Sequence, residues 1–599
     1  MPRLFDPAKK SRDRKRADAI LALTRGAQKI IGIYQGGGKT GLVIPEDVNL
    51  PFHILVHREN SRGAANGAVV VAEIITPGYQ GIGNPEGHIL EVLGDPNDLA
   101  VQTEIVIRRH DIPREFSRAA MTQSKSLSAG VGLDPDREDL RQIPHVTIDG
   151  ETARDFDDAV AIEKTREGFR LFVSIADVSY YVEPRTPLDQ EAYSRGTSVY
   201  FPSMVLPMLP ERLSNDLCSL VPHQDRLTLT AILDFDHEGI LIAKRFTRSI
   251  IRSQERLTYT IVTKILKDKD PMLRKTHQSL VKPLRFMAEL AGLLERVRMN
   301  RGSIGFTLPE AEIIIDPNGK ISTIGRRERQ LSHKIIEEFM LAANEAVAAT
   351  LYEYNFPALY RIHETPDPQK IAEFEEAAKV MGLSLPDEDP GSPAWFGRIL
   401  ALVADTPKEY IVNNLLLRTM KQARYSPYNL GHFGLAASYY THFTSPIRRY
   451  PDLLVHRALI DYLGQSRKKS PLGGENAISL EQDGDFLSNR ERVAIDAERD
   501  INDRLRILFM KDKIGETFSA VVSGFSGFGF FVELTDYFVS GAVATRDLQG
   551  KFYLDEKLHR LIGRNRKSSF QMGQLIEVTL KEVDQRRRWL NFVPAEKER

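Results

Sequence analysis

The sequence predicts a multidomain α+β protein in which a mixed α/β middle section lies between two small β-barrels. The first observation is length, because 599 residues correspond to roughly three to five domains at about 100–200 residues each. The second is that short apolar segments, separated by Gly, Pro and Asn, recur near both ends of the chain, which is typical of small barrels. The third is that long apolar patterns with helical spacing begin only in the middle section.

Composition narrows the class of protein. The chain is 42% hydrophobic and 27% charged, which is ordinary for a globular protein. One cysteine, Cys218, excludes an internal disulfide framework and a cysteine-based zinc site. No apolar run approaches the roughly 18–20 residues that span a bilayer, and the basic start, Met1–Arg16, lacks the apolar core of a signal peptide. These features predict a cytoplasmic protein with no membrane partner.

The charge balance leaves nucleic acid open as a partner. The chain has 81 basic and 81 acidic residues, but the placement of charge matters more than its sum. Basic residues concentrate at both ends, where they are candidate phosphate contacts or simply solvated. The two basic groups are Lys9, Lys10, Arg12, Arg14, Lys15 and Arg16, and Arg564, Arg566, Lys567, Arg586, Arg587 and Arg588.

The N-terminal barrel is predicted at 28–120, after a basic segment at 1–27. Its strand candidates are Gln28–Tyr34, Gly41–Ile44, His53–His57, Ala68–Ile75 and His88–Leu93. The run Gly36–Thr40 resembles a phosphate-binding loop, but position 33 is Ile rather than Gly, and strand-like residues follow where a helix is needed. A glycine-rich β-turn explains this run better. The polar residues 121–142 are predicted to be a linker.

The middle section, 143–464, mixes strand-like and helical patterns. Arg170–Val182 resembles a strand, and Ser332–Tyr354 has the apolar spacing of a helix. Residues 465–514 are expected to form a linker and a helix. Gln465–Gly484 has the composition of a flexible insertion, and Ser488 with Glu491 predicts a capping box that begins a helix running to about Lys513.

The C-terminal barrel is predicted at 515–595. Strand candidates lie on both sides of a turn rich in glycine and phenylalanine, and this composition fits a small barrel with exposed rings. The segments are Phe518–Ser523, Gly529–Leu534 and Leu575–Val583, with the turn at Gly524–Phe531.

The most informative stretch holds four aspartates within ten residues, between two apolar segments: Asp149, Asp155, Asp157 and Asp158. Two like charges about 4 Å apart repel by roughly 4 kcal/mol at an effective dielectric of 20. Converging carboxylates therefore need a cation or raised pKa values. Oxygen ligands of this kind suit Mg²⁺ shared with a substrate phosphate, and two such ions catalyse phosphodiester hydrolysis. A surface acidic turn or a calcium loop is the alternative, although the spacing does not follow the EF-hand rule.

A second constellation surrounds Thr444–Tyr450. Ser-Pro precedes a helical pattern from Ile447 to Leu459, and Arg448 and Arg449 lie near its start. Guanidinium groups there are suited to bidentate contact with phosphate oxygens. The neighbouring rings either stack on bases or fill the core, with core packing favoured, and the histidines are interpreted as structural. These side chains are Tyr439, Tyr440, Phe443 and Tyr450, and His432, His442 and His456.

Together these residues resemble the catalytic domain of the RNase II/RNase R (RNB) family of processive 3′→5′ exoribonucleases. The aspartate spacing and Thr444–Tyr450 match, and so do Gly196–Pro202, Pro207–Pro210 and Leu213–Leu220 between them. The resemblance extends from about Gln28 to Pro594. It implies that the N-terminal barrel is a cold-shock-like OB-fold, the second of the two usual in the family, and that the C-terminal barrel is an S1-type OB-fold.

The resemblance also implies roles in the catalytic domain. The four aspartates resemble the Mg²⁺-binding and catalytic carboxylates, with Mn²⁺ as a possible substitute, and Asp157 resembles the one most directly needed for chemistry. Arg448 matches the arginine that clamps the scissile phosphate. Tyr200 matches the ring that stacks at the RNA 3′ end, and Phe306 matches the opposing ring. Glu337 matches, on a weaker local motif, a carboxylate near that end.

In the S1-type barrel, Phe518, Phe528 and Phe531 are the expected stacking platform. Ala544 stands where the family usually has histidine, so one RNA contact is expected to be missing.

The expected function is Mg²⁺-dependent, processive 3′→5′ hydrolysis of single-stranded RNA to nucleoside 5′-monophosphates. The expected enzyme is an exoribonuclease II-type hydrolase that acts in RNA decay and processing, as a monomer with RNA 3′ ends as its partner. One alternative is a dedicated trimmer of tRNA or rRNA precursors. Another is an inactive RNA-binding regulator, which is disfavoured because Asp149, Asp155, Asp157, Asp158 and Arg448 are all present.

Overall fold

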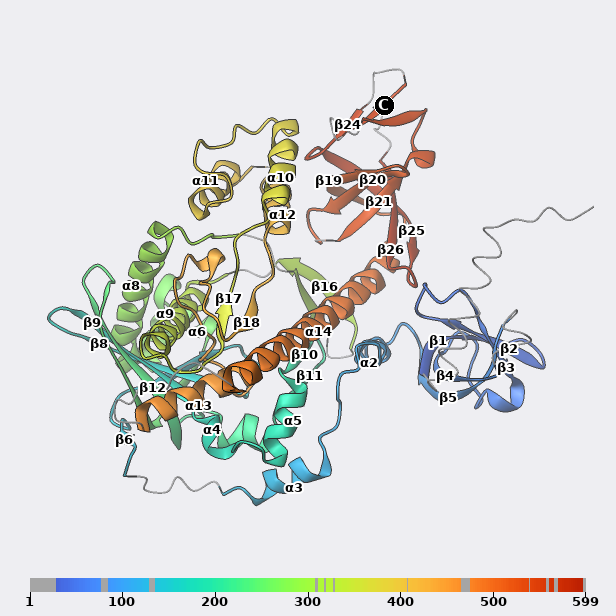
Figure 1. Cartoon of the computed structure of the whole chain (residues 1–599). Helices are drawn as coiled ribbons and strands as arrows, with labels where there is room; N and C mark the ends of the chain where they lie inside the picture. Colours follow the sequence, from blue (N-terminus) through green and yellow to red (C-terminus); the bar gives the residue numbers. More distant parts are fainter. Residues whose placement is uncertain are drawn as a thin grey trace, which may run out of the picture.

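A computed structural model describes residues 29–76, 84–128, 135–306, 311–316, 319–326, 329–406, 408–464, 475–537, 539–555, 560–564 and 569–595. Figure 1 shows a large central α/β region, a red barrel above it and a blue barrel to one side. The long helix α14 (Glu475–Lys511) runs from the central region toward the red barrel. The basic segment 1–27 lies outside the described residues. The predicted domain limits stay predictions.

The N-terminal barrel is closed, with strand order β1-β2-β3-β5-β4. Alternating residues of each strand point inward and bury an aliphatic core that includes Val43, Ile54 and Val70. The turn between β1 and β2 has Gly38 at φ +55° and a hydrogen bond from Thr40 N–H to Gly37 O at 3.0 Å, which confirms a β-turn rather than a phosphate loop. The strands are β1 (Lys29–Gln35), β2 (Thr40–Pro45), β3 (Ile54–His57), β4 (Val69–Thr76) and β5 (Glu86–Gly94).

The connection from this barrel to the central region contains more structure than the sequence predicts. Helix α2 (Leu99–Arg109) follows the barrel, and α3 (Arg118–Ser126) begins with Ser117, whose hydroxyl accepts the Ala120 N–H. Strand β6 (Glu138–Asp139) then pairs with the central sheet. The prediction of a linker at 121–142 is therefore wrong for these parts, because Ala120 and Leu140 are buried and anchor them.

The central sheet has the order β14-β7-β8-β9-β12-β13-β6 within the described residues. Most neighbours are antiparallel, and the pairs β14/β7 and β13/β6 are parallel. The predicted strand Arg170–Val182 is corrected at its end, because β9 stops at Ala176 and α4 follows. The strands are β7 (Val146–Asp149), β8 (Asp158–Lys164), β9 (Gly168–Ala176), β12 (Asp225–Asp236), β13 (Leu241–Arg252) and β14 (Glu255–Thr258).

Two long helices cover one face of this sheet. Helix α8 (Gln278–Asn300) and α9 (Leu331–Glu353) share a hydrophobic core with β8, β9 and β12, and α9 confirms the helix predicted at Ser332–Tyr354. The other face carries shorter elements in a second core. They are α4 (Val178–Tyr181), α5 (Pro187–Arg195) and the π-helical turn Arg212–Leu217. Helix α13 (Tyr450–Gly464) contributes side chains to both cores.

Smaller elements complete the central region. A helical group packs around the buried Trp395, and three two-stranded sheets lie apart from the main sheet. These elements are α6 (Tyr259–Thr263), α7 (Pro271–Thr276), α10 (Pro368–Val380), α11 (Pro393–Val403), α12 (Glu409–Thr419), β10 (Val199–Phe201), β11 (Met204–Leu206), β15 (Ala311–Ile315), β16 (Ile321–Arg326), β17 (Tyr360–Ile362) and β18 (Arg424–Ser426).

Helix α14 (Glu475–Lys511) begins earlier than the sequence predicts. Ser488 lies inside the helix, where its hydroxyl donates to Gly484 O at 2.6 Å and accepts the Tyr425 N–H at 2.9 Å. The predicted capping box at Ser488 and Glu491 is therefore wrong. The predicted flexible insertion is helical from residue 475 onward, and its residues 465–474 lie outside the described residues.

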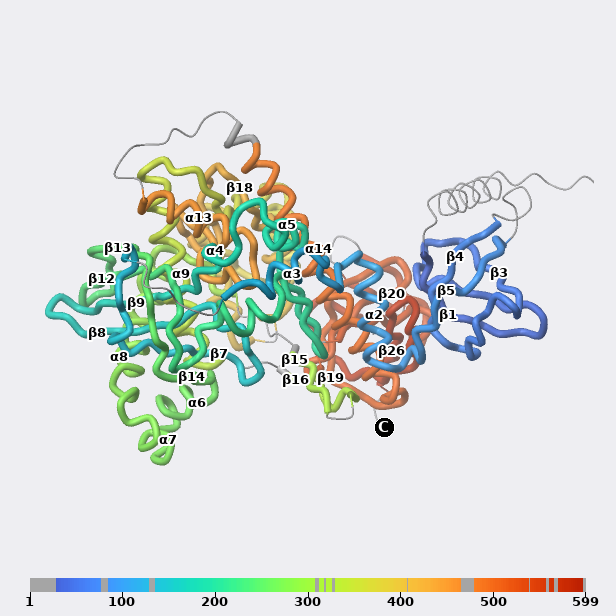
Figure 2. Tube along the Cα trace, turned by 90° about the horizontal axis from the view of Figure 1, so that it is seen from below, coloured from blue at the N-terminus to red at the C-terminus, as the bar shows by residue number. Residues whose placement is uncertain are grey.

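The C-terminal barrel is closed in the order β19-β20-β21-β26-β25, with a three-stranded sheet β22-β23-β24 attached. Ile507 and Met510, at the end of α14, belong to its core, so the helix and the barrel pack as one unit. The strands are β19 (Thr517–Ser526), β20 (Gly529–Leu534), β21 (Ser540–Ala544), β22 (Phe552–Asp555), β23 (Arg560–Gly563), β24 (Ser569–Gln571), β25 (Leu575–Asp584) and β26 (Trp589–Pro594). Figure 2 shows this barrel beside α2 and next to the N-terminal barrel.

Candidate active site

The four aspartates gather at one edge of the central sheet. Asp149 ends β7 and Asp158 begins β8. Because these neighbouring strands are antiparallel, the end of one lies beside the start of the other. Asp155 and Asp157 lie in the loop between the strands. The structure thus brings together the carboxylates that the sequence singles out.

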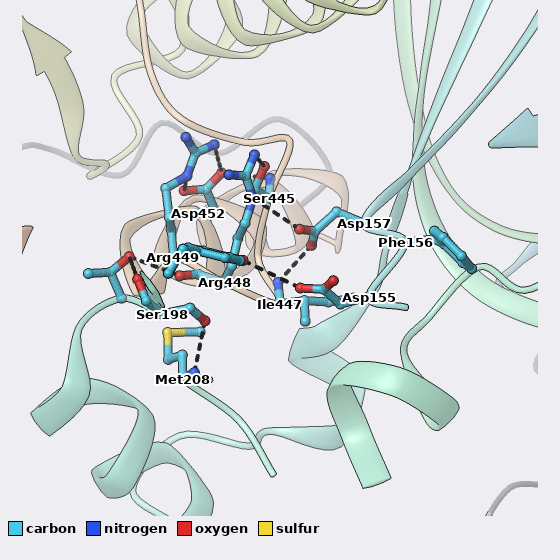
Figure 3. Close-up of polar contacts among 12 residues, drawn as sticks. Asp155, Phe156, Asp157, Ser198, Met208, Ser445, Ile447, Arg448, Arg449 and Asp452 are labelled. Carbon is cyan, nitrogen blue, oxygen red and sulfur yellow. Dashed lines mark hydrogen bonds and ion pairs between the residues drawn. The ribbon is translucent and has the colours of Figure 1, made fainter. Parts of the chain in front are cut away.

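Asp157 is the most enclosed of the four, with 5% of its surface exposed. Its Oδ1 accepts the Ile447 N–H at 2.8 Å, and its Oδ2 lies 3.5 Å from Arg448 Nε. Figure 3 shows both contacts, with the Phe156 ring pointing away from the carboxylates. Phe156 anchors the loop from behind, since its N–H donates to Ser219 Oγ at 3.0 Å and its carbonyl accepts the Leu220 N–H. The Leu213–Leu220 motif therefore fixes the loop that carries Asp157.

Burial raises the pKa values of three of these carboxyls, Asp149, Asp157 and Asp158. The pKa of Asp149 is raised to about 8, first by burial and then by the negative charges of Asp158 and Asp155, against the opposing charges of Arg256 and Arg448. Burial raises the pKa of Asp158 to about 6, opposed by Arg448. The pKa of Asp157 also lies well above its ordinary value because burial outweighs the charge of Arg448. The protein surroundings alone therefore favour the protonated, neutral forms of Asp149, Asp157 and Asp158 more than water does.

These residues fit a divalent cation that is shared with substrate. The Oδ2 of Asp149 is buried and has no hydrogen-bond partner, which is a costly arrangement unless a cation or water binds it. In the part of the chain that the structure describes, no three acidic, histidine or cysteine side chains are placed so that they could hold a metal ion by themselves. Mg²⁺ does not require such an arrangement, because it keeps several waters and uses few carboxylates together with phosphate oxygens.

The segment Thr444–Tyr450 gives its two arginines different surroundings. Arg449 donates to both carboxylate oxygens of Asp452, at 2.9 and 2.8 Å, and is held in place by that pair. Arg448 donates through one nitrogen to Ser445 Oγ at 2.9 Å and leaves 46% of its side chain exposed beside Asp157. Of the two arginines, only Arg448 keeps a largely exposed side chain, and its contact with phosphate stays a prediction.

Two motifs that are far apart in sequence join behind this arginine. The Arg448 carbonyl accepts the Ser198 N–H at 2.9 Å, and the Gly196 carbonyl accepts the Tyr450 N–H at 3.0 Å. Ser198 Oγ in turn accepts the Met208 N–H at 2.9 Å, as Figure 3 shows. These contacts place the strand β10, and with it Tyr200, next to the carboxylates.

Tyr200 is 38% exposed, and its hydroxyl lies 3.4 Å from Asp155 Oδ2. Burial and the charge of Asp155 raise the pKa of its phenol. Its backbone N–H donates to Glu498 Oε1 at 3.0 Å, so α14 fixes its position. Sequence reasoning missed Glu498, because a glutamate in a charged helix carries no signal that it faces inward.

Phe306 and Glu337 are not drawn into the same group by any contact in the structure's described part. Phe306 packs, half buried, against the helical group around Trp395. Glu337 lies on α9 with its carboxylate 3.5 Å from an Arg329 nitrogen. Their roles at the RNA 3′ end stay predictions.

The remaining rings and histidines have the structural roles that the sequence favours. Tyr440, Phe443 and Tyr450 are buried. His442 Nδ1 lies 2.8 Å from the Tyr425 hydroxyl, and His456 Nε2 lies 2.8 Å from the Phe443 carbonyl. Burial lowers the pKa values of both imidazoles.

The ring surface of the C-terminal barrel differs from the prediction at one position. Phe518 is only 7% exposed and packs in the barrel core, so its prediction as a stacking platform is wrong. Phe528 is 46% exposed and forms a group with Phe531 and Trp589, with ring centroids 5.6–6.1 Å apart. Sequence reasoning missed Trp589, although one of the chain's two tryptophans beside a basic run is a usable signal.

Comparison with known proteins finds three domain families along the chain. The RNB domain family matches residues 137–465, a cold shock domain matches residues 42–117 and an S1 RNA binding domain matches residues 511–592. None of the described helices is both long and apolar enough to cross a membrane.

Full-length relatives and a solved structure extend this result. Ribonuclease R of Escherichia coli is 41% identical over 597 residues, covering 98% of this chain and 73% of that protein. Ribonuclease R of Aquifex aeolicus is 39% identical over 590 residues, with 98% and 83% covered. Mycoplasma genitalium RNase R in complex with ribose-methylated single-stranded RNA has a TM-score of 0.86 and 26% identity over 95% of this chain and 89% of that one. The RNB match over more than half of the chain, together with these relatives, shows that the chain belongs to the RNB family of 3′→5′ exoribonucleases.

Proposed function

We propose that the chain is a Mg²⁺-dependent, processive exoribonuclease that releases nucleoside 5′-monophosphates from the 3′ end of single-stranded RNA. The observation that carries the proposal is the placement of Asp157. The Ile447 N–H fixes one of its oxygens at 2.8 Å, and Arg448 lies 3.5 Å from the other. The Asp157 carboxylate and the Arg448 guanidinium, which would bind phosphate, are thereby held at adjacent positions before substrate arrives.

Asp149, Asp155, Asp157 and Asp158 would hold the metal. When bound, Mg²⁺ supplies an activated water and stabilises the leaving oxygen of the phosphodiester. The Asp149 carboxyl is suited to a positively charged metal ion. Its buried oxygen has no other partner, and its pKa is raised to about 8 chiefly by burial. Mn²⁺ has similar ligand preferences and is expected to substitute.

Arg448 would bind the scissile phosphate. Its tether to Ser445 Oγ at 2.9 Å limits its freedom, so less entropy is lost when the guanidinium meets two phosphate oxygens. Tyr200 would stack on a base near the 3′ end, and its distance of 3.4 Å from Asp155 sets where the strand stops. This proximity of ring and carboxylates favours removal of one nucleotide at a time.

The C-terminal barrel would hold the strand before it reaches the active site. Its exposed Phe528, grouped with Phe531 and Trp589, is a sequence-tolerant surface for stacked bases. We further infer a monomer that works in the cytoplasm. A reducing compartment agrees with the single cysteine, Cys218, being buried and free.

The test is incubation of the purified chain with a 3′-labelled and a 5′-labelled single-stranded RNA, with Mg²⁺, with Mn²⁺ and with EDTA. The expected result is immediate release of labelled mononucleotide from the 3′ end, slow loss of the 5′ label, and no release in EDTA. A 3′-tailed duplex and a DNA of the same sequence serve as substrate controls. Internal fragments, or full activity in EDTA, would contradict the proposal.

A further inference from the structure

Asp500 lies on α14 where three parts of the molecule meet, and its side chain is 6% exposed. His110 Nε2, just after α2, lies 3.1 Å from Asp500 Oδ2, and Arg109 Nη1 lies 3.7 Å from the same oxygen. Arg504, one turn along α14, donates to Oδ1 at 2.8 Å. Arg588, in the turn between β25 and β26, donates to Oδ1 as well. The Asp500 carboxylate therefore binds groups from α2 and the residue after it, from α14 and from the C-terminal barrel.

Arg504 extends these contacts to the N-terminal barrel. Its Nη2 lies 2.7 Å from Glu46 Oε1, just after β2, and its Nη1 donates to Gln102 Oε1 at 3.0 Å. The Arg504 side chain is almost fully buried. Glu46, Arg504 and Arg586 help to line a cavity of only about 30 Å³. A larger cavity of about 1230 Å³, between the N-terminal barrel and α2, shares Glu46 with it.

The turn that carries Arg588 also contacts the N-terminal barrel directly. Arg586 Nε donates to the Pro45 carbonyl at 3.1 Å. Arg588 has φ +54°. This left-handed backbone conformation is unfavourable for residues other than glycine, so surrounding contacts must stabilise it. The interpretation of 586–588 as phosphate contacts is therefore corrected for Arg586 and Arg588, and Arg587 alone of the three is largely exposed.

The charge of Asp500 is what these contacts share. Burial acts to raise its pKa, but the hydrogen bond from His110 and the charges of Arg504, Arg588 and Arg109 outweigh burial and lower it. The carboxylate is therefore ionised, and its partners are arginines that are themselves partly or wholly withdrawn from water. Removing one charge from such a group leaves the opposite charges uncompensated.

Helix α14 also makes the contact that positions Tyr200, the ring proposed to stack at the RNA 3′ end. Glu498, two residues before Asp500, accepts the Tyr200 N–H at 3.0 Å. The segment 498–504 thus connects Tyr200, which lies beside the carboxylates, with both barrels. Because the segment 498–504 fixes the barrels relative to Tyr200, an RNA strand bound to a barrel reaches Tyr200 from a fixed direction.

We propose that Asp500 is a positioning residue for processive degradation: it fixes the two RNA-binding barrels to each other and to α14. Linked binding modules act together only when their geometry allows simultaneous contact with one strand. Loss of the charge lets the barrels move apart, so a long RNA dissociates more often between cleavages. A short RNA that occupies only the active site is cleaved as before.

The test compares Asp500→Asn, which keeps size and shape, with Asp496→Asn on the same helix, whose exposed carboxylate pairs only loosely with Arg499 at 3.8 Å. Processivity is measured by chasing bound long RNA with unlabelled competitor, and a very short RNA gives the turnover rate. Asp500→Asn is expected to shorten the processive run by at least about tenfold, with turnover of the short RNA within about twofold of the unaltered chain. Asp496→Asn is expected to change neither.

A second readout measures the barrels themselves. Cysteines replacing the exposed Lys39 and Lys551 accept a donor and an acceptor dye, while the buried Cys218 stays unlabelled. Asp500→Asn is expected to broaden the distance distribution between the dyes. Arg588→Gln is expected to broaden the distance distribution as well. The double variant is expected to be no broader than Asp500→Asn alone, since both substitutions remove the same Arg588–Asp500 contact. Arg588→Gln also serves as the probe if Asp500→Asn fails to fold.

Three results would overturn the proposal. One is an unchanged dye distance and processive run in the folded variants. Another is an equal loss of activity on long and short RNA, which would assign Asp500 a general role in stability. The third is full additivity of Asp500→Asn and Arg588→Gln. None of them bears on the exoribonuclease activity of the unaltered chain.

Discussion

The Ile447 N–H donates to Asp157 Oδ1 at 2.8 Å, although the two residues lie 290 positions apart in the chain. This bond joins the aspartate loop of the central sheet to the segment that carries Arg448. The carboxylate is oriented by backbone rather than by a mobile side chain, so its position survives changes at neighbouring side chains. The active site is thus built where two distant segments meet.

This bond makes Asp157→Asn a clean test of charge. The amide oxygen can still accept the Ile447 N–H, so the fold is expected to persist, while the negative charge that places a metal is lost. The rate of hydrolysis is expected to fall below about a tenth of that of the unaltered chain, which corresponds to a barrier higher by more than roughly 1.4 kcal/mol. The affinity for RNA is expected to be unchanged. Single-turnover kinetics and a binding titration measure both quantities. Asp496→Asn, at an exposed carboxylate outside the site, is the control, and turnover above a tenth would refute the assignment.

Tyr200→Ala is expected to change the length of the final product. Removing the ring removes base stacking worth roughly 1–3 kcal/mol and leaves the carboxylates in place. A ladder of labelled oligoadenylate, run to completion, displays the end product directly. Tyr354→Ala removes a similarly exposed ring on α9's far end and should give the ordinary product. Identical end products for both variants would remove Tyr200 from the 3′ site.

Phe528 and Phe518 offer a matched pair in the C-terminal barrel. Phe528→Ala is expected to weaken binding of long RNA by about 1–3 kcal/mol, with no change for a very short RNA and little change in unfolding. Phe518→Ala, in the core, is expected instead to destabilise the barrel by roughly 3–5 kcal/mol. Affinity titrations with long and short RNA and thermal unfolding separate the two outcomes. Equal effects of both variants on RNA binding would show that the exposed ring is not a platform.

The buried His145 is expected to contribute stability that rises with pH between about 4 and 6.5, a contribution that the raised pKa values of Asp149, Asp157 and Asp158 oppose. Burial lowers the pKa of this imidazole to about 4, and its Nε2 lies 2.9 Å from the Ser174 hydroxyl. In that window this imidazole binds more protons in the unfolded chain than in the folded one, so its contribution is lost as pH falls, by up to about 3 kcal/mol at a value of 1.36 kcal/mol per unit. Urea unfolding at several pH values measures the slope. His145→Gln should lower it, and His237→Gln, at an exposed imidazole, should not.

Sequence patterns predicted the parts of the molecule that local physics determines. Alternation located the N-terminal strands to within one or two residues, and helical spacing located α9. The carboxylates and Arg448 were found because four aspartates between apolar strands, and two arginines after Ser-Pro, are locally unusual. Asp149 and Asp158 then meet because β7 and β8 are adjacent.

The errors lie where a tertiary contact decides. Ser488 and Glu491 satisfy a capping pattern, yet Ser488 instead binds Gly484 and the Tyr425 N–H, and the helix continues through it. Phe518 lies in a run rich in phenylalanine, where spacing alone does not say which ring faces the core. Asp500 is one acidic residue among many in a charged helix, and only partners from elsewhere in the chain distinguish it.

The length of α14 carries a constraint on how this chain can vary. An α-helix turns by about 100° and advances about 1.5 Å for each residue. Inserting or deleting one residue between Glu498 and Met510 would therefore swing the C-terminal barrel a quarter-turn or more around the helix axis, although every side chain remained present. Substitutions along this stretch change contacts one at a time, whereas a change in length alters them all at once, so spacing here is as much a determinant of function as residue identity.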